Sequence, residues 1–334
     1  MTNVSTIVTA VTAFTITTML GMILIPMLKK LKFGQSIKED GPSWHKGKQG
    51  TPTMGGIMFI VGTAVSVILG YASLIIWDKT ALDLQQTVML FAGLVMAILF
   101  GLIGFLDDYI KVVKKQNEGL KAGQKIILQI LVATAFLTAL YIFGDRSTIV
   151  NIPFLGAFDF KALYYPIMGI LIIGIVNSAN LTDGIDGLAT SVTFVIGIFF
   201  MLASSYLALL GMNILATALS ASCIGFLVFN AHPAKVFMGD TGSLFLGGVV
   251  IALGFGLHME FILFFVGFIY CCESLSVILQ VISFKTTGKR IFRMSPIHHH
   301  FEMGGMSENK IVTMFTGITV LMCVIAFFAV IQIR

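Results

Sequence analysis

Long apolar runs separated by short polar segments dominate the chain. Each run is close to the roughly 20 residues that a helix needs to cross the hydrocarbon core of a bilayer. The pattern predicts ten membrane-spanning helices, near residues 5–28, 54–76, 87–106, 126–144, 162–179, 188–209, 212–229, 243–257, 260–284 and 311–333. The ninth run is long enough for its helix to tilt or break. We therefore expect an all-α polytopic membrane protein with about ten transmembrane helices, in a single domain over residues 1–334.

Composition agrees with this pattern. Hydrophobic residues make up 57% of the chain and charged residues only 11%, whereas an average soluble domain is about 25% charged. Intrinsic disorder, a collagen-like fibre and a disulfide scaffold are excluded by the same numbers. The four cysteines lie in apolar runs without a CxxC pair or metal-ligand spacing, so we expect buried, unreactive thiols.

The distribution of Lys and Arg predicts the orientation. Seventeen of the 21 fall in loops on one side of the predicted membrane, which the positive-inside rule makes cytoplasmic, with both termini outside. The net charge of +5 reflects this topology, and no nucleic-acid partner is expected. Acidic residues on the outer side, such as Asp78 and Glu260, are expected to be solvated loop charges. No positive charge precedes the first span and no small-residue cleavage site follows it, so it is expected to be an anchor.

No large soluble domain is predicted on either side, so any chemistry must take place among the cytoplasmic loops and helix ends. The first polar island there is Asp107-Asp108, at the predicted end of the third span. Adjacent carboxylates at a helix C-terminus oppose each other and the helix dipole. They are either a solvated pair that caps the span or a pair whose repulsion is offset by a cation or by Lys111 or Lys125.

A second island contains Asn180, Asp183 and Asp186, spaced by three residues. A helical or turn-like segment would place all three on one side, although the spacing alone is a weak signal. The third island contains Asp240, followed by Thr-Gly-Ser. These residue types favour helix starts, so they could simply cap the eighth span. Alternatively, the amides at that helix start bind a phosphate and Asp240 binds a metal.

Three consecutive histidines, His298, His299 and His300, lie in the long basic ninth loop. Adjacent residues cannot all point at one zinc ion. The histidines are either a patch at the membrane surface or imidazoles that hydrogen-bond phosphate oxygens or a leaving group. Glu273 is the only acidic residue deep inside a predicted span, and a functional role and a buried hydrogen bond within a bent helix are equally open.

Together these islands place aspartates, lysines and histidines at one membrane face. Carboxylates beside lysines suit Mg²⁺, which prefers one or two carboxylates together with substrate phosphates. A water-soluble phosphate donor would meet a lipid acceptor at this depth. The sequence therefore favours metal-dependent phosphoryl-type transfer at a membrane surface.

The ordered motifs carry a resemblance that covers nearly the whole chain. They are Gly-Thr-Pro-Thr-Met-Gly-Gly, Asp-Asp-Tyr-x-Lys, Asn-Leu-Thr-Asp-Gly-x-Asp-Gly-Leu, Phe-Met-Gly-Asp-x-Gly-Ser and Pro-x-His-His-His-Phe-Glu. The chain resembles the polyprenyl-phosphate N-acetylhexosamine-1-phosphate transferase family, and the histidine motif is typical of its phospho-N-acetylmuramoyl-pentapeptide-transferase members. The resemblance implies transfer of phospho-MurNAc-pentapeptide from UDP-MurNAc-pentapeptide to undecaprenyl phosphate, giving lipid I and UMP in peptidoglycan synthesis. It also implies a multi-pass protein of the bacterial cytoplasmic membrane and a homodimer.

The resemblance also implies roles for individual residues. Asp107 and Asp108 would lie near the lipid phosphate, Asp240 would bind Mg²⁺, and His298 and His299 would lie near the diphosphate; these five are the expected catalytic group. The expected substrate-binding residues are Lys48, Lys111, Lys125, Asn180, Asp183, Asp186, Phe237 and His300. Asp107 could deprotonate the lipid phosphate in a single displacement, and a two-step path through a covalent Asp stays open.

Two alternatives remain at this point. One is transfer of GlcNAc-1-phosphate from UDP-GlcNAc to the same lipid, which the histidine motif disfavours. The other is a secondary transporter, whose polar residues would lie at mid-membrane in broken helices and not at one face.

Overall fold

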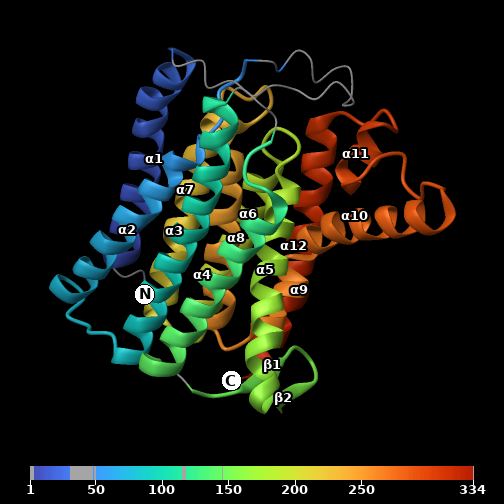
Figure 1. The fold of residues 1–334 in the computed structure, drawn as a ribbon. Helices are drawn as coiled ribbons and strands as arrows, with labels where there is room; N and C mark the ends of the chain where they lie inside the picture. Colours follow the sequence, from blue (N-terminus) through green and yellow to red (C-terminus); the bar gives the residue numbers. More distant parts are fainter. Residues whose placement is uncertain (1–3, 31–47, 49, 115–117, 145, 334) are drawn as a thin grey trace.

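The computed structural model is a bundle of long helices (Figure 1) and describes residues 4–30, 48, 50–114, 118–144 and 146–333. Five of the basic residues used to predict the orientation, Lys32, Lys38, Lys46, Lys115 and Arg334, lie outside these ranges.

Within the described ranges, ten helices are long and apolar enough to cross a membrane, as predicted. They are α1 (Val4–Lys30), α2 (Gly56–Ile76), α3 (Leu84–Val113), α4 (Ala122–Phe143), α5 (Tyr164–Thr182), α6 (Leu188–Tyr206), α7 (Leu210–Asn230), α8 (Gly239–Gly256), α10 (Phe268–Thr287) and α12 (Glu308–Ile333). Helix α8 is the most deeply buried of them. After its first turn its side chains are small or apolar on every face, as expected of a helix surrounded by other helices, and α3 and α5 pack along it.

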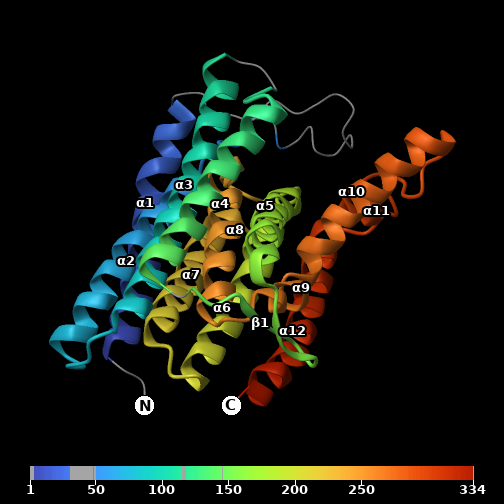
Figure 2. The ribbon, with the colours of Figure 1, turned by 60° about the horizontal axis from the view of Figure 1, so that its bottom comes forward.

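The ninth apolar run is broken, as its length suggested. It forms a 3₁₀ turn, η3 (Glu260–Ile262), a single turn of helix, α9 (Leu263–Val266), and then α10, which starts after Gly267. Figures 1 and 2 show α10 leading away from the bundle, with the short helix α11 (Ile297–Glu302) beside it. Large apolar side chains on α10, such as Ile282 and Phe284, are more than half exposed, which suits contact with lipid tails.

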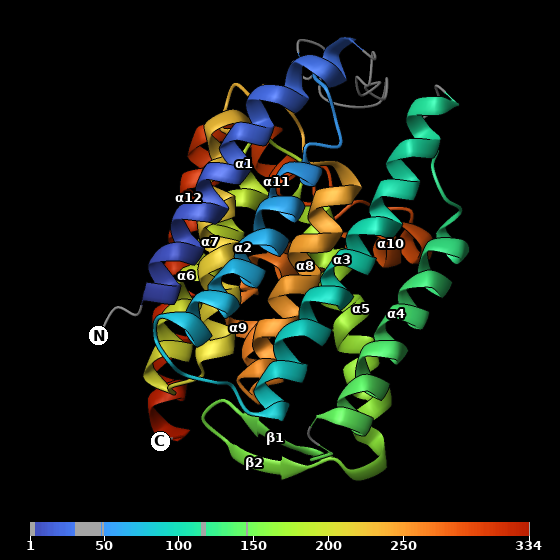
Figure 3. The ribbon, with the colours of Figure 1, turned by 90° about the vertical axis from the view of Figure 1, so that its left-hand side faces the viewer.

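A small β-hairpin departs from the all-α prediction. Strands β1 (Ile149–Ile152) and β2 (Gly156–Asp159) pair antiparallel in the segment expected to be a loop, followed by the 3₁₀ helix η2 (Lys161–Leu163). Figure 3 shows the hairpin lying across the end of the bundle that is remote from α11. The side chain of Val150 is fully buried there, so the hairpin covers this end of the core.

Two helix ends near the polar islands also differ from the prediction. Helix α3 continues to Val113 instead of ending near residue 106, and α8 begins at Gly239 instead of residue 243. The first extension has a physical cause, because residues 107–113 contain no glycine or proline and the ammonium of Lys111 pairs with Asp107 one turn later, at 2.6 Å. Asp107 and Asp108 therefore lie inside a helix.

At the hairpin end, the expectation of solvated loop carboxylates is wrong for Glu260 and incomplete for Asp78. The Glu260 side chain is buried and accepts a hydrogen bond from the Tyr164 hydroxyl at 3.0 Å. Asp78 accepts the first backbone N–H groups of α1, from Val4 at 3.1 Å and Ser5 at 3.0 Å. Burial opposes the charge of Asp78, but these hydrogen bonds outweigh it and lower the pKa of the carboxyl group. Asp78 thereby caps the N-terminus of α1.

Candidate active site

The first cluster consists of three carboxylates from two helices. Asp107 and Asp108 of α3 face Asp240 in the first turn of α8, and one oxygen from each lies within 4.8 Å of the others. The close approach depends on Gly104 of α3, since a Cβ there would lie 2.0 Å from the carbonyl oxygen of Asp240. Side chains of Asp107 and Asp108 are only 3% and 4% exposed, so the interpretation as a solvated pair is wrong.

Asp108 caps helix α8 from the neighbouring helix. Its Oδ1 accepts the backbone N–H of Asp240 at 3.2 Å, and its Oδ2 accepts the N–H and hydroxyl of Thr241 at 2.9 and 2.7 Å. Gly239 makes this possible with φ of +69°, and a Cβ on it would lie 2.4 Å from Oδ2 of Asp108. The start of α8 is thus capped by Asp108, and not by its own Asp-Thr-Gly-Ser segment as one of the two sequence interpretations had it.

Asp107 and Asp240 are both paired with lysines, as the second interpretation of the acidic pair expected. Asp107 accepts the backbone N–H of Leu120 at 2.8 Å and lies 2.6 Å from the ammonium of Lys111. Oδ2 of Asp240 lies 3.2 Å from the ammonium of Lys111 and 2.8 Å from that of Lys125 on α4. The two ammonium groups offset the repulsion among the three carboxylates.

Asn180, near the end of α5, completes the first cluster. Its amide donates to Oδ1 of Asp240 at 2.9 Å and to the hydroxyl of Ser243 at 2.7 Å. One turn away, Gln129 of α4 and Asn177 of α5 form a reciprocal amide pair, at 3.2 and 2.7 Å. The sequence analysis missed this pair, although two amides within apolar runs were a signal. The pair holds α4 beside α5, and so places Lys125 and Asn180 on opposite sides of Asp240.

The donor atoms of the first cluster fit a divalent metal. Three carboxylates supply hard oxygen ligands, and Mg²⁺ is usually bound by one or two carboxylates together with phosphate oxygens and water. Because Asp108 is committed to the backbone of α8, Asp240 is the carboxylate best placed to hold the ion, with Asp107 beside it.

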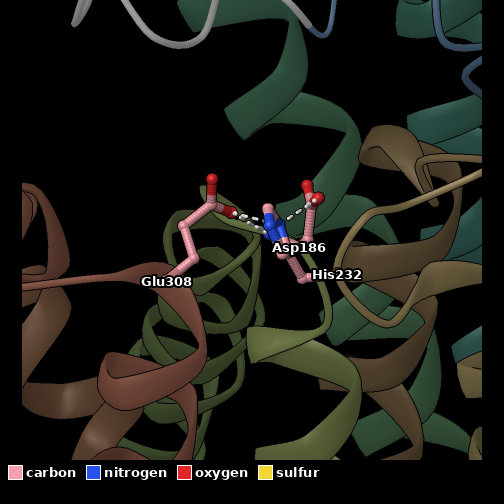
Figure 4. Close-up of side chains that lie close together, drawn as sticks. All are labelled: Asp186, His232 and Glu308. Atoms are coloured by element: carbon pink, nitrogen blue, oxygen red, sulfur yellow. Dashed lines mark hydrogen bonds and ion pairs between the residues drawn. The ribbon is translucent and has the colours of Figure 1, made fainter.

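A second cluster forms around Asp186 (Figure 4). Its Oδ2 accepts the backbone N–H of Ala234 at 3.0 Å and lies 3.0 Å from Nδ1 of His232. Oε2 of Glu308, the first residue of α12, lies 3.7 Å from the same nitrogen and accepts the backbone N–H of Asp186 at 3.1 Å. The ammonium of Lys48 lies between the two acids, 2.7 Å from Asp186 and 2.6 Å from Glu308. Three groups of this cluster have metal-ligand spacing, and the single ammonium of Lys48 offsets only part of the negative charge of the two carboxylates.

The three-residue spacing did not place its members on one side. Asn180 belongs to the first cluster and Asp186 to the second, because α5 ends at Thr182 and the chain then turns. Asp183 follows that helix end, outside the spanning segment. Desolvation, and then the negative charges of Asp240, Asp108 and Asp186, raise the pKa of Asp183 well above its usual range. Both clusters therefore act electrostatically on Asp183.

The three histidines have three different partners. Nδ1 of His298 lies 3.0 Å from the Glu273 carboxylate, Nδ1 of His299 lies 2.6 Å from that of Glu302, and Nδ1 of His300 accepts the backbone N–H of Arg293 at 3.1 Å. His298 is fully buried, which rules out a membrane-surface patch for this residue. The rings of His298 and His299 lie side by side, with centroids 4.1 Å apart, but the three Nδ1 atoms face different partners, so the histidines do not share one site.

Phe237 lies between the first motif and α8. Its backbone N–H donates to the carbonyl of Pro52 at 2.8 Å, and its own carbonyl accepts the N–H of Gly55 at 2.8 Å. The Gly-Thr-Pro-Thr-Met-Gly-Gly segment is thus paired with the strand-like chain that leads into Asp240. This pairing connects Lys48, just before the segment, to the first cluster. Sequence reasoning missed His232 and Glu308, because neither belongs to a recognisable local pattern.

Comparison with known proteins adds to this geometry. Residues 90–258 match the family described as glycosyl transferase family 4, and residues 48–60 match the phospho-N-acetylmuramoyl-pentapeptide-transferase signature 1. The chain is 48% identical to the phospho-N-acetylmuramoyl-pentapeptide-transferase of Clostridium perfringens, over 95% of this chain and 96% of that protein. It is 44% identical to the protein of that name from Acetivibrio thermocellus, over 95% and 93%, and 43% identical to that of Caldicellulosiruptor bescii, over the full length of both. The first match includes all three carboxylates of the first cluster, and the signature includes Lys48.

Proposed function

Because the chain belongs to the phospho-N-acetylmuramoyl-pentapeptide-transferase family, we propose that it transfers phospho-MurNAc-pentapeptide from UDP-MurNAc-pentapeptide to undecaprenyl phosphate. The products are lipid I and UMP, in peptidoglycan synthesis. The observation that carries the proposal is the buried cluster of Asp107, Asp108 and Asp240 with two lysine ammonium groups. Such a cluster suits the phosphates of both substrates at the end of a membrane-spanning bundle.

The protein is a multi-pass membrane protein, and we place it in the bacterial cytoplasmic membrane as a single domain over residues 1–334. The bundle end that carries both clusters faces the cytoplasm, where the UDP-linked substrate is available, and both termini face outward. The excess of Lys and Arg in the loops of that end supports this orientation. Undecaprenyl phosphate reaches the same end from the lipid. We further propose a homodimer, on family resemblance.

In the reaction, an oxygen of the lipid phosphate attacks the sugar-bearing phosphorus of the UDP-sugar. The new O–P bond forms as the bond to the bridging oxygen breaks, and UMP departs with that electron pair. Mg²⁺ held by Asp240, with Asp107 beside it, would supply Lewis-acid neutralisation of the diphosphate charge. Positioning and electrostatic stabilisation provide most of the rate in such transfers.

The chain's own residues divide that work. Lys111 and Lys125 hold phosphate oxygens beside Asp240, and Asp107 removes the last proton from the lipid phosphate. Asp108 fixes the first turn of α8, and Asn180 orients Asp240. A two-step path with a covalent aspartyl intermediate would require Asp107 to leave Lys111 and Leu120, its partners among the described residues.

The nucleotide part of the substrate is assigned to the second cluster. Lys48 and Asp186 offer charged groups for the nucleoside and its phosphates, with Phe237 and Asp183 nearby along the same loops. His298 and His299 act on the diphosphate side and His300 holds the loop. The 17 basic residues predicted at this end of the bundle favour an anionic substrate there.

The proposal is tested by measuring UMP release from purified protein with undecaprenyl phosphate, Mg²⁺ and one of two donors. UDP-MurNAc-pentapeptide should release UMP and UDP-GlcNAc should not. If UMP is released from UDP-GlcNAc and not from UDP-MurNAc-pentapeptide, the GlcNAc-1-phosphate transferase is favoured. No release from either donor, with transport activity in proteoliposomes, would favour a transporter.

His298→Ala and His299→Ala are expected to slow turnover about 10- to 150-fold each, as for the loss of a hydrogen bond to a charged group. His300→Ala should have a smaller effect, because its ring contacts the backbone of Arg293. UMP release by the three single variants at saturating lipid and Mg²⁺ makes the comparison. Wild-type rates in both of the first two variants would contradict the assignment.

Glu308→Gln is expected to raise KM for UDP-MurNAc-pentapeptide about 3- to 10-fold with little change in kcat. The amide preserves the shape but removes one of the two negative charges that hold the ammonium of Lys48. Initial rates over a range of donor concentrations give both constants. The matched control is Glu260→Gln, a change of the same kind at the opposite end of the bundle. An unchanged KM would mean that Glu308 does not position Lys48.

A further inference from the structure

Glu273 of α10 is a buried acid that neither cluster contains. Its side chain is fully buried, and Oε1 has no hydrogen-bond partner among the described residues. A carboxylate at this depth in a membrane-spanning helix is costly unless it is paired. A buried carboxylate at this position is therefore expected to have a partner and a structural or functional role.

The partner of Glu273 is His298. Nδ1 of His298 lies 3.0 Å from Oε2 of Glu273, in a close polar contact that lacks the alignment of a hydrogen bond. The backbone N–H of His298 also points at this oxygen, at 3.4 Å. Both side chains are fully buried. The carboxylate therefore determines where the imidazole ring lies.

The other side of the imidazole faces the loop between α5 and α6. A Cβ on Gly184 would lie 2.1 Å from Nε2 of His298 and 2.4 Å from its Cε1. The ring thus packs against the backbone between Asp183 and Asp186, and Nε2 has no hydrogen-bond partner among the described residues. Asp186 in turn holds Lys48 at 2.7 Å. A series of contacts leads from the membrane helix to the nucleotide-binding residues.

A further hydrogen bond fixes the helix that carries Glu273 to the helix that carries the loop. The hydroxyl of Ser274 on α10 donates to that of Ser178 on α5 at 2.6 Å, one turn before α5 ends. Since α10 otherwise leads away from the bundle (Figure 2), this contact and the Glu273–His298 pair define how its first turns meet the site.

We infer that Glu273 is a positioning residue for the transfer reaction: it holds His298 against Gly184 and thereby fixes the loop that carries Asp183 and Asp186. The inference rests on the proposed function for its choice of substrate. It resolves the two roles that the sequence left open for Glu273. Glu273 contacts His298 of α11, and not a group within its own helix, and through His298 it positions the loop at the active site.

The test is a double-mutant cycle of Glu273→Gln and His298→Ala, assayed by UMP release with both substrates varied. Each single variant should lose about 10- to 100-fold in kcat/KM for UDP-MurNAc-pentapeptide, and the double variant should lose no more than the worse single one. KM for this donor should rise, while KM for undecaprenyl phosphate stays within about twofold. Losses that multiply in the double variant would overturn the inference, as would an unchanged KM for UDP-MurNAc-pentapeptide in Glu273→Gln.

Glu260→Gln is the matched control, because Glu260 is also a buried glutamate but lies at the opposite end of the bundle. It should keep wild-type KM values for both substrates. If Glu273→Gln does not fold, as judged by thermal unfolding, Glu273→Asp replaces it and should be folded and slow; a wild-type rate in it would overturn the inference. Failure of the proposed function gives a different result, since wild-type protein would then release no UMP from this donor.

Discussion

Asp240→Ala is expected to abolish UMP release, with a loss of roughly a thousandfold or more. Charge stabilisation by a catalytic metal is worth several kcal/mol, and no neutral side chain replaces a hard anionic ligand. The carboxylate also pairs with Lys111 and Lys125, so its removal leaves two cations without their shared partner. EDTA should abolish UMP release by the wild-type protein in the same assay. Added Mg²⁺ should restore the activity of the wild type but not that of the variant.

The control for Asp240→Ala separates lost chemistry from lost folding. Asp159→Ala removes an exposed carboxylate from β2, at the far end of the bundle, and should keep the wild-type rate. Asp240→Asn keeps the shape of the side chain and an oxygen for the amide of Asn180, so it should fold and still be inactive. Near-normal UMP release by correctly folded Asp240→Ala would remove Asp240 from the metal site.

The number and approximate position of the spans could be predicted because a helix in a bilayer must present about 20 apolar residues in a row. The ends of the spans near the site could not be predicted in this way. Residues 107–113 contain three charged side chains within two turns, which resembles a loop. In the structure, Lys111 neutralises Asp107 and the helix continues. A charge count along the chain cannot distinguish a solvated charge from one that is paired.

The members of the first cluster could be predicted from the motifs, but their contacts could not. Lys125 and Asp240 are 115 positions apart, and only the packing of α4 and α5 around α8 brings them together. His232 and Glu308 illustrate the same limit more strongly. Neither belongs to a recognisable local pattern, and the importance of each arises from Lys48 and Asp186, which belong to other elements.

The hairpin was missed for a different reason. Val150 and Ile152 alternate with polar or exposed positions, and Gly156 follows within a short turn, which is typical of two short strands. The apolar spans on either side are the stronger signal, so the sequence predicts a loop for the polar segment between them. Four-residue strands carry too few positions for a period of two to stand out.

The adjacent aspartates Asp107 and Asp108 are expected to respond differently to the same substitution. Asp107→Asn should lower kcat about 10²- to 10⁴-fold, the usual contribution of a general base, with both KM values nearly unchanged. Its thermal stability should change little, because the amide oxygen still accepts the N–H of Leu120. A rise in KM with unchanged kcat would instead make Asp107 a binding residue.

Asp108→Asn should lower thermal stability, because both carboxylate oxygens accept hydrogen bonds from donors at the start of α8. The amide of Asn has only one acceptor oxygen, and its NH₂ group would face a donor at the start of α8. The buried donor left without an acceptor should lower the free energy of unfolding by about 1–3 kcal/mol. Turnover should fall as well, since the first turn of α8 holds Asp240. Thermal unfolding and UMP release on both variants separate the two roles: Asp107→Asn is folded and slow, whereas Asp108→Asn is destabilised and slow. Equal stability of the two variants would contradict the capping role of Asp108, and a wild-type rate in Asp107→Asn would exclude it as the base.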